Sequence, residues 1–166
     1  MEYLIPAMKY LECKLVIAGD GNFMEQLKNL INSNNLINKI ELLGMLEPNQ
    51  LKIKTSQAFI GISLVENLGL NQYWSLTNKF FDYINAGIPQ ITMNYPEYKK
   101  INEQFEIALL IDDLTPKTIA NAVNKLLDNK IYYLRLKENC LKAKEVLNWE
   151  NEEKQLLNFY ENILKN

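Results

Sequence analysis

The chain has 166 residues, about one ordinary domain, and its content of 48% hydrophobic and 23% charged residues excludes a disordered protein. Eighteen basic residues stand against 20 acidic ones, and a net charge of -2 excludes binding of nucleic acid through a broad basic field. The absence of histidine excludes Ser–His and Cys–His nucleophile systems and most zinc sites.

The cysteines and the N-terminal segment indicate a cytoplasmic protein. Cys13 and Cys140 form no Cys-x-x-Cys pair, and we expect both to be buried, reduced thiols. No apolar stretch approaches the roughly 20 residues of a membrane span, and residues 1–11 lack the basic start and the cleavage site of a signal peptide.

Strands and helices are predicted to alternate along the first half of the chain. Residues 1–11 predict a helix with Leu4, Met8 and Leu11 on one side. Apolar runs then predict three strands, and helical spacing predicts two helices between them, the second with a proline in its first turn. The strands are 13–19, 39–44 and 58–64, and the helices are 22–35 and 48–57.

The second half continues the alternation after a polar loop at 65–74. Helices are predicted at 77–86, 95–104, 115–129, 131–147 and 150–164, and strands at 89–94 and 107–112. We expect the last helix to serve packing. Apolar strands that alternate with helices predict one α/β domain over residues 1–166, a three-layer, Rossmann-like parallel sheet with helices on both faces. Ligands of such a sheet bind at the carboxyl ends of its strands.

The start of the helix at 77–86 is the strongest candidate for a ligand site. Ser75 and Thr77 stand at N-cap positions, and the first-turn amides that follow could bind a phosphate together with the Lys79 charge. Asp82 lies about one turn further along and could accept hydrogen bonds from a pair of ribose hydroxyls. A surface ion pair between Lys79 and Asp82 explains the same spacing, and both interpretations stay open.

Two other loops carry weaker signals. The turn at 18–22 places Gly19 and Gly21 at a strand–helix junction, but it lacks the third glycine of a dinucleotide fingerprint, so a tight turn capped by Asp20 is the simpler interpretation. The loop at 65–75 combines Glu66 with aromatic and amide side chains, which suits either sugar binding or a mobile surface loop.

Six segments in order resemble the C-terminal, nucleotide-sugar-binding half of a GT-B glycosyltransferase of group 1 (family 4). They are LVIAGDGNFMEQL, IELLG, AFIGISL, SLTNKFFDYINAGIPQI, LLIDDLTPKTIANAVNKLL and NWENEEKQLLNFYENIL, and the match extends over nearly the whole chain, from Leu15 to Leu164. The resemblance implies transfer of a sugar from a nucleotide diphosphate donor, with retained anomeric configuration, without a bound metal or other cofactor. Relatives usually act in cell-envelope polysaccharide or lipopolysaccharide synthesis, where the full-length enzyme associates peripherally with a membrane.

The resemblance also implies roles for individual residues. The turn and helix start at 76–79 would lie against the donor phosphates, Asp82 would bind the ribose, and the backbone at 44–46 would lie against the base. The donor-binding residues implied in this way or expected from the helix start are Gly19, Asp20, Gly21, Gly44, Met45, Leu46, Ser75, Leu76, Thr77, Asn78, Lys79 and Asp82.

The departures from the family pattern concern catalysis. The first of a glutamate pair common in the family falls at Trp74, which cannot act as a carboxylate, and Glu66 is a weak candidate to replace it. The family's first strand, with its Arg or Lys for the diphosphate, and the N-terminal acceptor domain are expected to be missing. We therefore expect weak donor binding and no turnover by this chain alone.

Two further classes of function compete with this one. The alternative is a non-catalytic or truncated module that binds a nucleotide or a partner protein, or itself, through the sheet edge left open by the missing strand. A nucleotide-sugar epimerase is disfavoured, because its active site needs acidic residues that this chain does not show.

Overall fold

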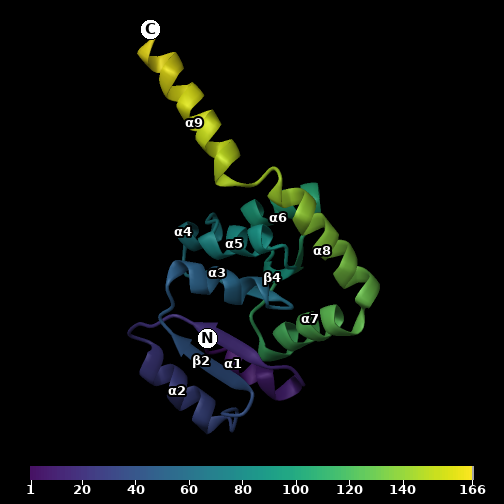
Figure 1. The fold of residues 1–166 in the computed structure, drawn as a ribbon. Helices are drawn as coiled ribbons and strands as arrows, with labels where there is room; N and C mark the ends of the chain where they lie inside the picture. Colours follow the sequence, from purple (N-terminus) through teal and green to yellow (C-terminus); the bar gives the residue numbers. More distant parts are fainter. Residues whose placement is uncertain (166) are drawn as a thin grey trace.

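The computed structural model describes residues 1–165 and shows parallel strands between layers of helices (Figure 1). The elements in chain order are α1 (Leu4–Ala7), the 3₁₀ turn η1 (Met8–Tyr10), β1 (Leu15–Ala18), α2 (Met24–Ser33), β2 (Ile40–Gly44), α3 (Pro48–Ser56), β3 (Gly61–Ser63), α4 (Leu70–Tyr73), α5 (Asn78–Ala86), β4 (Gln90–Met93), α6 (Pro96–Phe105), β5 (Ala108–Ile111), α7 (Pro116–Asp128), α8 (Lys130–Lys144) and α9 (Trp149–Leu164).

The strands form two parallel sheets where one was predicted. β1 pairs with β2, and β3, β4 and β5 pair in that order. The α/β class, the parallel pairing and the helices on both sides are confirmed. The division lies between β1 and β3. Each of these strands is paired along one edge, and the two are not paired with each other.

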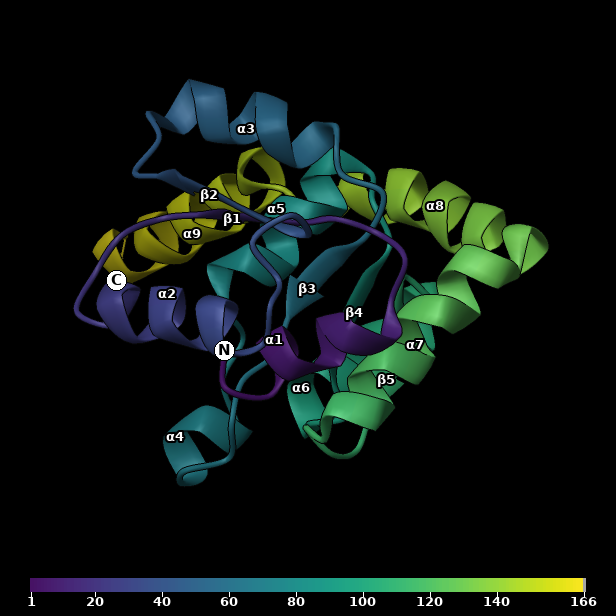
Figure 2. The same cartoon turned by 90° about the horizontal axis from the view of Figure 1, so that it is seen from below.

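Helices cover the strands from two sides (Figures 1 and 2). α1 packs on α7 on one side, whereas α5 packs on both α3 and α8 on the other. Leu4, Met8 and Leu11 are all buried, as predicted for one side of the N-terminal segment. The helical segment is shorter than predicted, because α1 passes into the 3₁₀ turn after Ala7.

Local sequence explains the limits of α5, the helix that positions the candidate site. Phe80 and Ile84 lie four residues apart and are both fully buried, so one face of the helix is held against the core. The helix ends at Gly87, whose φ of 70° is left-handed and favours glycine. The Gly87 amide donates to the Ile84 carbonyl at 2.9 Å and closes the last turn.

Two segments differ from their predictions. The loop at 65–74 contains the short helix α4. The final helix α9 extends away from the rest of the chain (Figure 1), and none of its described residues is buried, so the packing role predicted for it is wrong in this structure. No helix within residues 1–165 is long and apolar enough to cross a membrane.

Candidate functional site

Two glycine turns meet at the carboxyl ends of β1 and β2. The Gly19 amide donates to the Gly44 carbonyl at 2.7 Å, which ties the turns together. Gly19 and Gly44 have φ values of 134° and 65°, which favour glycine. An added Cβ would touch no atom within 4 Å at either position, so packing does not require glycine there and the space in front of the turns is open.

Asp20 caps this turn locally. Its carboxylate accepts a hydrogen bond from the Gly21 amide at 2.7 Å, and α2 begins only at Met24. The tight turn predicted at this position is therefore confirmed, with Asp20 bonded to the turn and not to the helix. On the neighbouring loop Met45 is strongly exposed, whereas Leu46 is half-buried.

The start of α5 has one of the two predicted N-cap residues. Thr77 occupies the N-cap position, but its hydroxyl lies 3.0 Å from the Ser63 hydroxyl and accepts from the Tyr98 hydroxyl at 3.4 Å. The Thr77 amide also donates to the Tyr98 oxygen, at 3.2 Å. Ser75 does not reach α5, because its hydroxyl donates to the Gln72 carbonyl at the end of α4. The N-cap position predicted for Thr77 is thus confirmed, and the one predicted for Ser75 is wrong.

The consequence is an open helix tip. Among the residues that the structure describes, no side chain caps the first turn of α5. Asn78 and Lys79 are exposed, Leu76 is half-buried beside them, and the Phe80 amide is bonded to the Thr77 carbonyl at 3.0 Å. The amides at the front of the helix therefore face solvent with the positive end of the helix dipole.

The start of α7 shows what a capped helix start looks like in the same fold. The Thr115 hydroxyl accepts from the Thr118 amide at 3.2 Å, as expected at an N-cap. Lys117 is the second residue of α7, as Lys79 is of α5. The two helix starts differ in whether a side chain occupies their amides.

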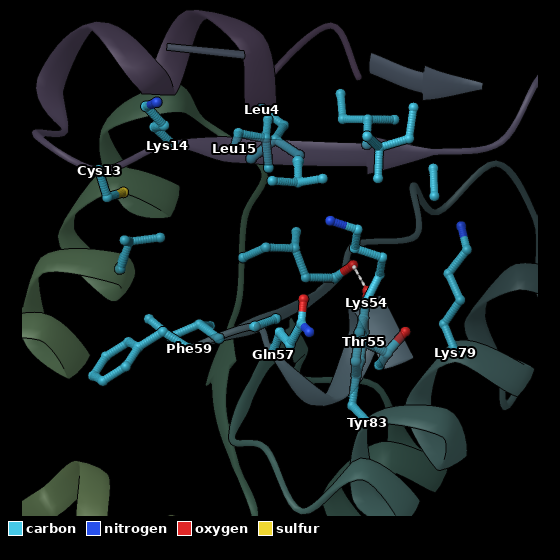
Figure 3. A pocket seen from close by; sticks show the side chains of 18 of the residues that line it. Leu4, Cys13, Lys14, Leu15, Lys54, Thr55, Gln57, Phe59, Lys79 and Tyr83 are labelled. Atoms are coloured by element: carbon cyan, nitrogen blue, oxygen red, sulfur yellow. Dashed lines mark hydrogen bonds between the residues drawn. The ribbon is translucent and has the colours of Figure 1, made fainter. Parts of the chain in front are cut away.

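Lys79 and Asp82 line one cavity, as their spacing predicted. Figure 3 shows the Lys79 side chain extending from α5 across this space. No salt bridge joins the two side chains in the described part of the chain, so the surface ion pair that explained the spacing equally well is not formed. Burial raises the pKa of the Asp82 carboxyl, and the charge of Lys52 on α3 partly opposes this.

The loop between β3 and α5 is anchored at its start and exposed further along. The Tyr95 hydroxyl donates to the Val65 carbonyl at 2.8 Å. Glu66 accepts from the Tyr3 hydroxyl at 3.3 Å, and its charge, together with this bond, raises the pKa of Tyr3. Trp74 is exposed and meets Tyr73 edge-on, with ring centroids 5.5 Å apart.

Sequence reasoning missed the supports behind α5. Tyr98 is fully buried on α6 and Ser63 is buried in β3, and both bind Thr77. The sequence carries no local signal for this contact, because the residues lie 14 and 21 positions from Thr77. No group of three or more potential metal-ligating side chains gathers within residues 1–165.

Comparison with known proteins adds a family match and a fold match. The model of the family "Glycosyl transferases group 1" matches residues 1–143. An uncharacterized glycosyltransferase of Methanocaldococcus jannaschii is 46% identical over 61 residues, which are 36% of this chain and 15% of that protein.

Two solved structures have the same fold. Sucrose-phosphate synthase from Thermosynechococcus elongatus has a TM-score of 0.81 and 20% identity, over 99% of this chain and 42% of that one. Anabaena HepE, solved in complex with UDP, has a TM-score of 0.77 and 15% identity, over 96% of this chain and 44% of that one. The chain thus spans less than half the length of these proteins.

Proposed function

Because the chain belongs to the group 1 glycosyl transferases, we propose that it is the donor-binding half of a hexosyltransferase whose donor is a nucleoside diphosphate sugar. The observation that carries the proposal is the uncapped, solvent-facing start of α5, with Lys79 in its first turn. The complex of HepE with UDP supports a diphosphate as the anchoring group.

The site would hold each part of the donor by a different kind of contact. The diphosphate would accept hydrogen bonds from the Asn78 and Lys79 amides and gain the charge of the Lys79 ammonium. The Asp82 carboxylate, one turn further along, would accept hydrogen bonds from the ribose hydroxyls. The open turns at Gly19 and Gly44 would lie beside the sugar and the base, respectively.

The same contacts would assist bond breaking. Negative charge grows on the diphosphate as the glycosidic bond to the sugar breaks, and fixed amide dipoles with a lysine stabilise that charge more than they stabilise the ground state. We propose that this assistance serves a retaining transfer without a bound metal, in envelope polysaccharide or lipopolysaccharide synthesis on the cytoplasmic side of a membrane.

The isolated chain is proposed to bind donor weakly and not to transfer sugar. It spans 42% of the sucrose-phosphate synthase chain and 44% of HepE. Glu66, the weak candidate for a catalytic carboxylate, is bonded to Tyr3 in this structure. Sugar transfer measured with the purified chain and any acceptor would refute this part of the proposal.

The test is a titration of the purified chain with UDP, GDP and ADP and with the matching monophosphates, followed by calorimetry and by melting temperature. A ligand of the folded state raises the melting temperature according to its concentration over its dissociation constant. We expect at least one diphosphate to bind more tightly than its monophosphate. Lys79→Ala should weaken that binding about tenfold, which corresponds to the loss of about 1.4 kcal/mol.

Lys117→Ala is the matched control. It removes an exposed lysine from the same position of α7, where Thr115 already caps the helix, and should leave the affinity unchanged. Asp82→Ala should weaken nucleotides but not inorganic pyrophosphate, because pyrophosphate has no ribose. Binding of no diphosphate, or equal losses in Lys79→Ala and Lys117→Ala, would refute the site.

A further inference from the structure

The start of α5 differs from the other helix starts that carry a threonine or an asparagine. Within residues 1–165 four helices have Thr or Asn at the N-cap position. In three of them the side chain accepts a hydrogen bond from an amide of its own helix, and these side chains are Thr115, Asn129 and Asn148. Thr77 is the fourth, and it does not cap α5. Because a threonine at this position ordinarily caps its helix, the hydroxyl of Thr77 must be bonded elsewhere.

Two buried hydroxyl groups from other elements hold Thr77. Its hydroxyl lies 3.0 Å from the Ser63 hydroxyl at the end of β3, and it accepts from the Tyr98 hydroxyl on α6 at 3.4 Å. The Tyr98 oxygen also accepts from the Thr77 amide at 3.2 Å, so Tyr98 bonds both the side chain and the backbone of Thr77. Ser63 is 3% exposed and Tyr98 is fully buried. We call these two residues the Ser63–Tyr98 pair.

The Ser63–Tyr98 pair is itself fixed in the core. Ser63 lies opposite Thr92 in the register of β3 and β4, and the Ser63 carbonyl accepts from the Thr92 hydroxyl at 2.9 Å. The Tyr98 ring packs on Phe80 in the first turn of α5, with ring centroids 5.0 Å apart. Because closely packed side chains have little room to move, the pair keeps the Thr77 hydroxyl at one place.

A released Thr77 hydroxyl would compete with a ligand for the amides of α5. An N-cap oxygen accepts from the second or the third amide of its helix. The third amide, that of Phe80, already donates to the Thr77 carbonyl at 3.0 Å. The second amide, that of Lys79, is left for the hydroxyl, and it is one of the two amides that the proposed donor site assigns to the diphosphate. A capping hydroxyl would therefore have to be displaced before a diphosphate could bind.

We propose that Ser63 and Tyr98 are positioning residues of the donor site. They hold the Thr77 hydroxyl away from the start of α5 and so keep the Lys79 amide available to a nucleoside diphosphate. Both residues are buried, so they act through Thr77 and not by contact with the donor. This inference rests on the proposed function, because it concerns the same helix start.

The first experiment needs no ligand. Hydrogen exchange of the Lys79 amide is followed by NMR in the natural chain and in the double variant Ser63→Ala/Tyr98→Phe, which lacks both hydroxyls of the pair. We expect the amide to exchange about fivefold more slowly in the double variant, because the released Thr77 hydroxyl caps it. Adding Thr77→Val to the double variant removes the capping hydroxyl and should restore the faster exchange.

The second experiment measures binding in a double-mutant cycle. UDP, GDP and inorganic pyrophosphate are titrated by calorimetry, and the pair is removed once in the natural chain and once in the Thr77→Val background. In the natural chain, removal of the pair should weaken pyrophosphate and the diphosphate that binds about fivefold. In the Thr77→Val background it should change the affinity by less than about twofold, since no hydroxyl remains to compete. A purely structural role of the pair would weaken binding equally in both backgrounds.

Tyr133→Phe is the matched control. It removes the hydroxyl of another buried tyrosine, which donates to the Phe59 carbonyl at 3.1 Å and not to Thr77. We expect it to change neither the exchange rate of the Lys79 amide nor the affinity for any of the three ligands. Melting temperatures of all variants check that they fold.

The single variants Ser63→Ala and Tyr98→Phe keep the test possible if the double variant does not fold. Each leaves one hydroxyl on Thr77, so each should show the same dependence on Thr77→Val with a smaller effect. An unchanged exchange rate of the Lys79 amide, or equal losses of affinity in the two backgrounds, would overturn the positioning role and leave the donor site standing. If none of the three ligands binds the natural chain, the donor site fails, and the positioning role fails with it.

Discussion

Gly61→Ala tests how β3 and α5 are held together. Gly61 is buried in β3, and the Tyr83 ring of α5 lies directly on its backbone. A Cβ added at Gly61 would lie within 2.7 Å of three carbons of that ring, so the ring would have to move. Its hydroxyl would then lose the bond to the Ile62 carbonyl.

The magnitude follows from three contributions. Overpacking of a filled site destabilises by about 1 to 3 kcal/mol. The lost hydrogen bond adds about 1 kcal/mol, and the lower entropy of the unfolded chain with alanine returns about 0.4 to 1 kcal/mol. We expect a net loss of about 1 to 3 kcal/mol in the free energy of unfolding, or about 3 to 10 °C in melting temperature for a chain of this size.

Urea unfolding followed by circular dichroism measures the effect, with Gly69→Ala as the control. A Cβ at Gly69 would meet only the Gln72 side-chain oxygen, at 3.6 Å, which is an ordinary contact. Tyr83→Ala in the same background should remove most of the cost of Gly61→Ala, because the clashing ring is gone. The reasoning is refuted if Gly61→Ala costs as little as Gly69→Ala, or if the double variant shows no coupling.

Three further changes have defined outcomes. Gln90 is fully buried, its Nε2 donates to the Phe80 carbonyl, and its Oε1 has no hydrogen-bond partner within residues 1–165. In urea unfolding, Gln90→Met should therefore change the free energy of unfolding by less than about 1.5 kcal/mol. Gln90→Glu should reduce the same free energy by more than about 3 kcal/mol. Burial raises the pKa of the Cys140 thiol to about 12. In the native chain Ellman's reagent at pH 8 should therefore modify only the half-buried Cys13, whereas after unfolding it should modify both thiols. Burial raises the pKa of Asp82 in the folded chain, so the ionised form of Asp82 opposes folding. Asp82→Asn should therefore be more stable than the natural chain at pH 7, by less than about 1 kcal/mol. This difference should vanish as the pH falls below about 4, where Asp82 is protonated in both the folded and the unfolded chain.

Periodicity and end signals were enough to predict most of the elements. All five strands lie inside the apolar runs that predicted them, and α7 begins at Thr115 and Pro116 as its cap and first-turn residues indicated. α5 also follows its sequence, since Phe80 and Ile84 fix its buried face and Gly87 ends it. These features depend on residues within a few positions of each other, which a linear pattern records.

Features that depend on distant segments were not predictable in this way. A Thr at an N-cap ordinarily bonds its own helix, but Thr77 meets Ser63 and Tyr98, which topology alone brings to it. Cys13, expected to be buried, is only half-buried because it lines the cavity between the two sheets. Val16 belongs to an apolar run typical of a strand buried on both faces, yet it is 51% exposed. Val16 lines the same cavity, which leaves its side chain partly uncovered.

The cavity between the two sheets also gives a physical reason for the weak donor binding that is proposed for this chain alone. The turns at Gly19 and Gly44 follow the strands of one sheet, whereas the start of α5 is fixed through Thr77 and Ser63 to the other. The proposed donor site therefore has its two halves on different sheets, and Lys79 and Asp82 line the gap between them. A site whose halves are not held at a fixed distance loses affinity to the ordering that binding requires.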